Sequence, residues 1–200
     1  MNILNRLSRF ADSYKAQSGY YKAIFICVWF LSASVAAYAD DVHDAYKLYK
    51  QGQHDKAFEK VSEFLAAKPG DARARFLLGL ILSEQGKTAE AMETLSSLNE
   101  DYPELPEPYN NLAVLYASQG QYEKARLSLE MAIRNNPGYA TAHENLGDIH
   151  ARMAGMAYGR ASELDHKNNS VKSKLTMIQG ILSDGNGKAS PVFMEPAPQQ

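Results

Sequence analysis

The clearest pattern of apolar and polar positions covers residues 106–139 and predicts two short helices joined by a turn. Apolar residues recur at intervals of three and four on each side of Gly120, the spacing that places them on one face of an α-helix. A turn between antiparallel helices commonly needs a positive φ, which glycine adopts at little cost. Pro137 is expected to end the second helix because it has no N–H to donate. The apolar positions are Tyr109, Leu112, Ala113 and Tyr116 before the turn, and Tyr122, Ala125, Leu129, Ala132 and Ile133 after it.

The same landmarks appear twice more upstream, in register. Each kind of landmark recurs at a step of 34 residues (120 − 86 = 34 for the turn glycines). A fixed period of about 34 residues, made of a helix, a turn and a second helix, indicates a stack of repeated units. The turn glycines are Gly52, Gly86 and Gly120, the small residues early in each second helix are Ala57, Ala91 and Ala125, and the closing prolines are Pro69, Pro103 and Pro137.

On these residues, segment 38–139 resembles tetratricopeptide repeats (TPRs). The resemblance implies an all-α solenoid in which three full repeats stack and bury a continuous core. The first repeat is the weakest match, since it has Asp44 where the next two have Leu78 and Leu112. Terminal repeats of solenoids are often atypical because one of their faces meets water.

The fourth repeat begins normally and then departs from the pattern. The next turn glycine would fall at position 154, which is alanine, and apolar residues from Leu146 to Leu164 form one unbroken stripe at helical spacing. We therefore predict an altered fourth repeat in which residues 140–165 are one long helix, with a helical hairpin as the alternative.

The regions that follow complete the predicted domain organisation. The TPR domain is expected over residues 40–168, and a C-terminal capping helix over residues 169–183. Residues 184–200 are rich in glycine, proline and polar residues and are expected to be disordered. Three residues of the types favoured at helix N-caps are expected to cap helices, namely Asp71, Thr88 and Asn169.

The N-terminal residues 1–39 have the pattern of a secretory signal peptide. A basic region precedes a run over residues 23–36 that is apolar except for Ser32 and Ser34, and the small-x-small sequence Ala37-Tyr38-Ala39 follows it. The run is shorter than the roughly 20 residues that a spanning helix needs, although an uncleaved membrane anchor is the alternative because the basic region is long. Either reading predicts a periplasmic or secreted location for the repeats, or an inner-membrane anchor with the domain outside the cytoplasm.

Composition and motifs argue against several classes of function. The net charge is −2 and no basic stripe with interleaved aromatics is present, so nothing points to nucleic acid. The single cysteine, Cys27, lies in the signal segment. His143 and His150 are seven residues apart, whereas a close helical metal pair needs a spacing of four. We find no phosphate loop and no catalytic set, and predict no enzyme activity, no cofactor, no metal and no small-molecule substrate.

The resemblance implies a binding surface instead. In TPR arrays the first helices of successive repeats line a concave groove that holds a peptide or protein segment. Asparagine there can grip an extended backbone, because its side chain has both a donor and an acceptor. The family places these residues in the groove: Tyr46, Tyr49, Lys50, Arg73, Phe76, Leu80, Asn110, Asn111, Val114 and Asn145.

The predicted function is therefore a non-enzymatic scaffold or assembly factor of the bacterial cell envelope that binds another protein or peptide. Residues 143–165 also resemble small proteobacterial envelope TPR proteins. The alternative is a structural homo-oligomer of the envelope with no separate peptide ligand. Membrane contact is expected only if the N-terminal segment stays uncleaved.

Overall fold

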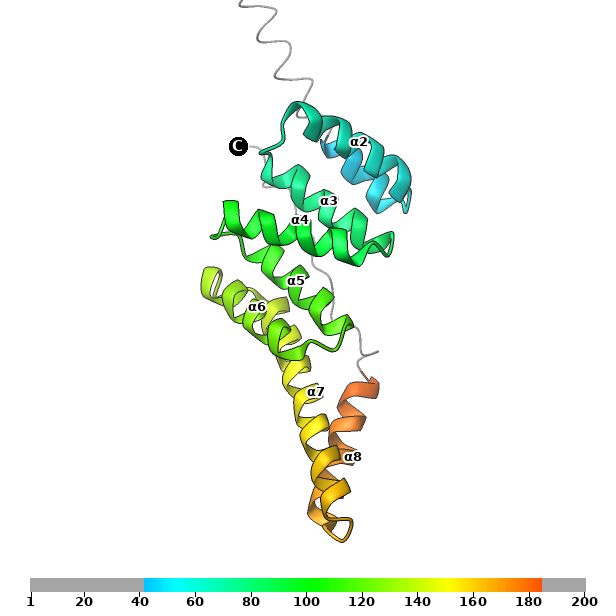
Figure 1. Cartoon of the computed structure of the whole chain (residues 1–200), viewed down its shortest axis with the longest axis vertical. Coiled ribbons are helices and arrows are strands. Elements are labelled where there is room, and N and C mark those ends of the chain that lie inside the picture. Colours follow the sequence, from blue (N-terminus) through cyan, green and yellow to red (C-terminus); the bar gives the residue numbers. More distant parts are fainter. Residues whose placement is uncertain (1–41, 185–200) are drawn as a thin grey trace, which may run out of the picture.

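The computed structural model describes residues 42–184, all of which lie in helices or in the short turns between them (Figure 1). The predicted signal segment lies outside these residues, and so does the predicted tail apart from Asp184. The first helix covers residues 42–50 of the described chain. The others are α2 (His54–Ala67), α3 (Ala72–Glu84), α4 (Thr88–Asp101), α5 (Pro106–Ser118), α6 (Tyr122–Asn135), α7 (Ala140–Leu164) and α8 (Asn169–Asp184).

The three turn glycines adopt the left-handed conformation that the sequence predicts. Gly52, Gly86 and Gly120 have φ values of 73°, 73° and 72°. The residue after each glycine donates its N–H to the carbonyl five residues earlier, as in Gln121 N to Tyr116 O at 2.9 Å. This bond satisfies a carbonyl that the end of the helix would otherwise leave unpaired. The 34-residue period therefore reflects a glycine that ends a helix in the same way in each of the three repeats.

Helix starts agree with the sequence only in part. Asp71 caps α3, and its Oδ1 accepts a hydrogen bond from Ala74 N at 2.9 Å. Thr88 does not cap α4: it is the first helical residue, and Lys87 before it makes no side-chain cap. The cap of α8 is Asn168 rather than Asn169, since Asn168 Oδ1 accepts from Val171 N at 3.2 Å. The error at α8 is one residue long, because Asn168 and Asn169 are both of a capping type. At α4 neither Thr88 nor Lys87 supplies a side-chain cap.

The helices pack in chain order, each against the next, with α3 also touching α5 and α5 also touching α7. Two buried apolar clusters run through the stack, one around α3 and α4 and one around α6 and the first half of α7. Hydrogen bonds 32 residues apart join successive repeats, from Tyr102 Oη to Gly70 O at 2.5 Å and from Asn135 Nδ2 to Pro103 O at 2.7 Å. This nearest-neighbour packing is that of a solenoid.

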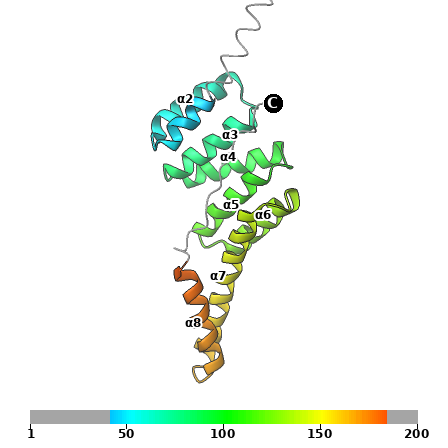
Figure 2. The same ribbon diagram turned by 180° about the vertical axis from the view of Figure 1, so that it is seen from behind.

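Residues 140–164 form one continuous helix, as predicted, and not a hairpin. The residue at the missing turn is Ala154, whose Cβ makes the left-handed conformation unfavourable by about 1–2 kcal/mol. The helix therefore continues past the point where the other repeats turn. Its second half leaves the stack and runs beside α8 (Figures 1 and 2).

The α7–α8 hairpin, residues 150–184, packs far more loosely than the repeats. Between residues 150 and 182 no side chain is buried, whereas Ile149, the last core residue, is 1% exposed. Apolar side chains on both helices stay largely exposed, among them Met156, Leu164, Met177 and Ile181. Among the described residues, no helix has the length and apolarity required to cross a membrane.

Candidate binding groove

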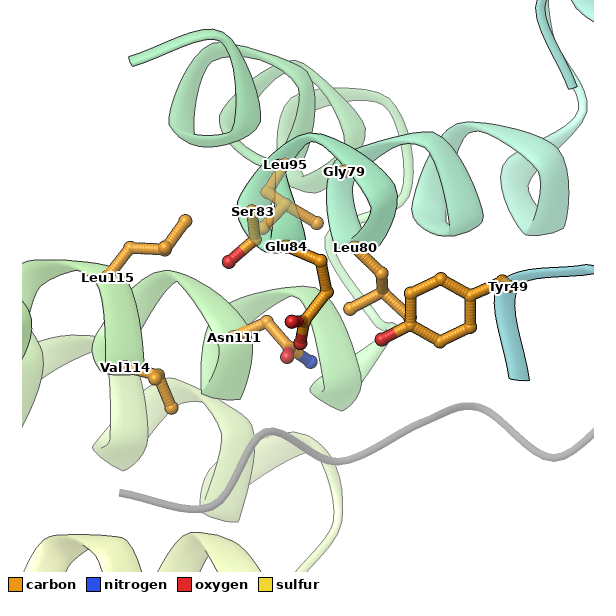
Figure 3. A pocket seen from close by; sticks show the side chains of 9 residues that line it. All are labelled: Tyr49, Gly79, Leu80, Ser83, Glu84, Leu95, Asn111, Val114 and Leu115. Carbon is orange, nitrogen blue, oxygen red and sulfur yellow. The ribbon is translucent and has the colours of Figure 1, made fainter. Parts of the chain in front are cut away.

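The first helices of three successive repeats meet at a small recess, which is a candidate binding site. Its enclosed volume is only about 20 Å³, room for about one water molecule. A site this shallow offers a surface against which a peptide side chain can pack, rather than an enclosed pocket for a small molecule. The recess is lined from the first helix by Tyr49, from α3 by Gly79, Leu80, Ser83 and Glu84, from α4 by Leu95, and from α5 by Asn111, Val114 and Leu115 (Figure 3).

The walls of the recess are apolar and its rim is polar. Leu80 and Leu115 are buried, Val114 is half-buried, and the exposed carboxylate of Glu84 lies at the edge. Tyr49 contributes its ring and is held by an edge-on contact with His54, at 5.5 Å between ring centroids. Burial, with a smaller contribution from the nearby Glu84, raises the pKa of Tyr49 well above its usual range, so the phenol stays neutral and can serve as a hydrogen-bond donor.

The structure brings only part of the predicted set to this recess. Tyr49, Leu80, Asn111 and Val114 line it together. Tyr46 is half-buried, and Lys50 and Arg73 are exposed on neighbouring turns outside the lining. The remaining predicted residues, Phe76, Asn110 and Asn145, are buried in the stack at exposures of 2%, 0% and 1%. Tyr49, Leu80 and Asn111 at the recess are themselves only 4% to 5% exposed, so ligand contact by any of the predicted residues stays a prediction.

The two asparagines at the same repeat position, Asn111 and Asn145, have different partners. Asn145 Nδ2 donates across the helix pair to Asn110 Oδ1 at 2.9 Å, and this bond is buried. Asn111 Nδ2 donates to Glu107 O of its own helix at 2.9 Å. The difference follows from the preceding repeat: the residue 34 before Asn110 is Phe76, whose ring offers no acceptor.

The Asn110–Asn145 bond gives a first testable prediction. Asn145→Leu and Asn110→Leu should each lower the free energy of unfolding by about 1–3 kcal/mol, because each leaves the other amide buried without its partner. The double variant should cost less than the sum, since leucine has nearly the shape of asparagine. Urea unfolding of the four proteins measures the coupling, and strictly additive losses would contradict an energetic role for this bond.

Ser83 and Glu84 line the recess but are absent from the predicted set. A signal for them exists in the sequence, because they lie three and four residues after Leu80 and therefore on the same face of one helix. No group of three or more histidine, cysteine, aspartate or glutamate residues within residues 42–184 is arranged to hold a metal ion. His143 Nε2 lies 3.1 Å from Pro137 O, a local contact at the start of α7.

Comparison with known families agrees with this architecture. The family model described as "Tetratricopeptide repeat" matches residues 48–111, and the one described as "TPR repeat" matches residues 115–153. The chain belongs to the tetratricopeptide repeat family. The two matches cover the repeats and the first half of α7, and they stop where the α7–α8 hairpin leaves the stack.

Curated relatives extend the likeness in sequence. The TPR repeat-containing protein YvcD of Bacillus subtilis is 30% identical over 181 residues, which is 90% of this chain and 32% of that protein. This TPR chain thus spans about a third of the length of that relative. The photosystem I assembly protein Ycf3 of Prochlorococcus marinus is 28% identical over 122 residues, covering 56% of this chain and 70% of the relative.

Solved structures show the same fold at low sequence identity. The first TPR domain of Spaghetti (RPAP3), a domain also described for the human protein, was solved with an HSP90 peptide of sequence SRMEEVD. It superposes with a TM-score of 0.55 at 17% identity, over 58% of this chain and 93% of that one. This likeness concerns the fold, and the peptide belongs to that protein.

Proposed function

We propose that this TPR chain is a non-enzymatic scaffold or assembly factor of the bacterial cell envelope, and that it binds a segment of another protein through the recess. The observation that carries the proposal is the recess itself, where apolar walls from Leu80 and Leu115 meet a polar rim from Asn111 and Glu84. Such a shallow site would let one apolar side chain of an extended peptide pack against its walls, while polar groups at the rim hydrogen-bond to the peptide backbone.

Two relatives support a role in protein binding. One is named a photosystem I assembly protein, and the RPAP3 domain is described with a bound peptide. The envelope location rests on the signal-like residues 1–39. Mass spectrometry of the mature N-terminus together with cell fractionation tests that part of the proposal, and a chain retained in the cytoplasm would contradict it.

The binding test needs a variant that blocks the recess and still folds. Phe76 and Leu80 are unsuitable, because truncating such buried side chains costs about 2–5 kcal/mol. Val114→Glu is better, since Val114 is half-buried and lines the recess. The new carboxylate would occupy the space that an apolar side chain of the partner would otherwise take, and it would face Glu84. Leu127→Glu is the matched control, because Leu127 is 50% exposed on α6 and lies outside the recess lining.

We expect Val114→Glu to capture at least about tenfold less of the envelope partner, because the complex would bury one apolar side chain fewer. Leu127→Glu should capture as the wild type does. The measurement is quantitative crosslinking and pull-down from an envelope fraction, with circular dichroism confirming that both variants fold. Equal capture by Val114→Glu and Leu127→Glu would show that the recess is not the binding site.

A second candidate function, a structural homo-oligomer, is favoured by one observation. Met156, Leu164, Met177 and Ile181 leave apolar surface on the α7–α8 hairpin, from 58% to 73% exposed. Light scattering of the purified chain distinguishes the two candidates: a stable multiple of the monomer mass that Met177→Lys abolishes would favour self-association.

A further inference from the structure

The two helices of the α7–α8 hairpin lie antiparallel in a defined register. An added Cβ on Gly155 would lie 3.2 Å from Ile178 Cγ2, and Lys174 Nζ lies 5.6 Å from the centre of the Tyr158 ring. Both contacts fit a register in which residue 156 of α7 is level with residue 177 of α8. Of the helices α2 to α8, α8 packs against α7 alone. Helix α8 therefore turns one side to α7 and the rest of its surface outward.

An apolar strip runs along one side of this hairpin. On α8, Met177 and Ile181 follow Lys174 at steps of three and four residues, so the three side chains share one side of the helix. Lys174 reaches the Tyr158 ring, which places that side of α8 next to the side of α7 that carries Tyr158. Leu164 continues the Tyr158 side toward the tip of the hairpin, two steps of three residues further on. Leu164, Met177 and Ile181, which we call the hairpin strip, are 73%, 66% and 58% exposed.

The hairpin and the repeats carry opposite net charge. Residues 42–149 hold 11 basic and 16 acidic residues, a net charge of −5, whereas residues 150–184 hold five basic and three acidic residues, a net charge of +2. An anionic surface therefore attracts the hairpin and repels the repeats, which orients the chain toward that surface. The basic residues of the hairpin are Arg152, Arg160, Lys167, Lys172 and Lys174.

The hairpin also projects from the molecule. Figures 1 and 2 show α7 and α8 extending beyond the last repeat, with the tip of the hairpin at one end of the structure. A flat surface can therefore lie along the hairpin without meeting the repeats. Exposed apolar side chains next to lysine are typical of helices that lie at a membrane interface, because the apolar groups enter the acyl boundary while the lysines reach the lipid phosphates. A second hairpin would instead bring two positive surfaces together, which disfavours a second copy as the occupant.

We propose that the α7–α8 hairpin docks on the surface of an anionic membrane, with the hairpin strip entering the interface and Lys174 beside a lipid phosphate. Burial of apolar surface and attraction to anionic lipids both contribute to such docking. Each lysine near an anionic surface strengthens it about fivefold. The inference is independent of the recess. It holds even for a chain cleaved after Ala39, for which the sequence predicts no membrane contact.

The test places a polarity-sensitive dye at one position of the full chain. Cys27→Ser removes the single cysteine, and Met177→Cys then carries the dye in the hairpin strip. Leu127→Cys is the matched control, because Leu127 is 50% exposed on α6, among the repeats. The probes are vesicles of phosphatidylcholine alone and vesicles in which about one lipid in four is phosphatidylglycerol. We expect the dye at position 177 to brighten and shift to shorter wavelength with the anionic vesicles, and the dye at position 127 to stay unchanged.

Lys174 supplies a test of the charge. At sub-saturating lipid, the ratio of docked to undocked hairpin, read from the dye at position 177, should fall about fivefold in Lys174→Gln, because one lysine near the surface is lost. Lys174→Arg keeps the positive charge and can keep the contact with the Tyr158 ring, so it should dock as the parent chain does. Lys56→Gln, on α2 among the repeats, is the matched control and should also dock unchanged. Circular dichroism confirms that all the variants fold.

Several results would overturn the inference. An unchanged dye at position 177 with anionic vesicles means that the hairpin does not reach the bilayer, and equal changes at positions 177 and 127 mean that another part of the chain sets the contact. Equal signals with neutral and anionic vesicles, or equal docking of Lys174→Gln and the parent chain, mean that charge does not select the surface. A change at position 177 without vesicles, with a doubled mass in light scattering, means that a second copy covers the strip. None of these results alters the expected difference between Val114→Glu and Leu127→Glu in partner capture, so the proposed function is judged separately.

Discussion

Leu95→Ala is expected to lower the free energy of unfolding by about 2–5 kcal/mol, among the largest effects of any single substitution in this chain. Leu95 lies on α4, is 1% exposed, and belongs to the cluster that joins the first three repeats. Its truncation would leave a cavity beside Gly79, because helices fixed by neighbours on both sides cannot close it. Urea unfolding followed by circular dichroism measures the loss as a lower midpoint with an unchanged m value.

The same contact between Gly79 and Leu95 predicts that the stability losses caused by substitutions at these two positions are coupled. A Cβ at position 79 would lie 2.8 Å from Leu95 Cδ2, closer than packed atoms tolerate, so Gly79→Ala should cost about 1–3 kcal/mol even though alanine is the better helix former. In the Gly79→Ala, Leu95→Ala double variant the new methyl group enters the space that the leucine leaves. We expect the double variant to be more stable than the sum of the single losses predicts. Additive losses would contradict this close packing of α3 on α4.

Ala154→Pro is expected to unfold the α7–α8 hairpin and leave the repeats folded. Proline removes the hydrogen bond from the N–H of residue 154 and clashes with the carbonyl of His150, at a cost of about 3 kcal/mol or more. The packing of the hairpin is too weak to offset that cost in free energy, because no side chain between residues 150 and 182 is buried. Hydrogen exchange should show lost protection over residues 150–184 and retained protection over residues 54–149.

Ala154→Gly serves as the control for this prediction. Glycine keeps the backbone N–H and costs about 1 kcal/mol in a helix interior, so protection of the hairpin should decrease only modestly. Glycine also permits the positive φ of the other repeat turns. Two results would contradict the account: unchanged protection of the hairpin in Ala154→Pro, or simultaneous loss of protection in the repeats.

The architecture could be predicted because it depends on local backbone chemistry. A left-handed residue is needed at each turn, and only glycine adopts that conformation cheaply, so Gly52, Gly86 and Gly120 mark the turns in advance. Alanine at position 154 marks the absence of a turn in the same way, which is why the length of α7 followed from the sequence. The error at Asn169 was one residue long, because the neighbouring Asn168 has the same side chain and makes the cap instead. At Thr88 the helix begins without a side-chain cap.

The candidate site could be predicted less well, because neighbouring helices cover the first helix of each repeat on several sides. Seven of the 13 residues of α3 are buried, so its apolar pattern does not separate a core face from a groove face. Phe76 and Leu80 have similar sequence contexts, yet only Leu80 reaches the recess. The family resemblance placed Asn145 in the groove, whereas the structure buries it, although burying an unpaired amide is costly. That cost is offset at Asn145 by a partner, Asn110, that comes from a different repeat.

The sequence by itself determined the repeat family, the positions of the turns, the single helix α7 and the identity of the residues on the first helices. These features depend on φ preferences and helical periodicity, which act within one or two turns of chain. The tertiary structure decided which first-helix side chains stay accessible, because accessibility depends on contacts between residues 30 or more positions apart. It buried Asn110, Asn111 and Asn145 alike, and it left Val114 half-buried and Glu84 exposed at the recess.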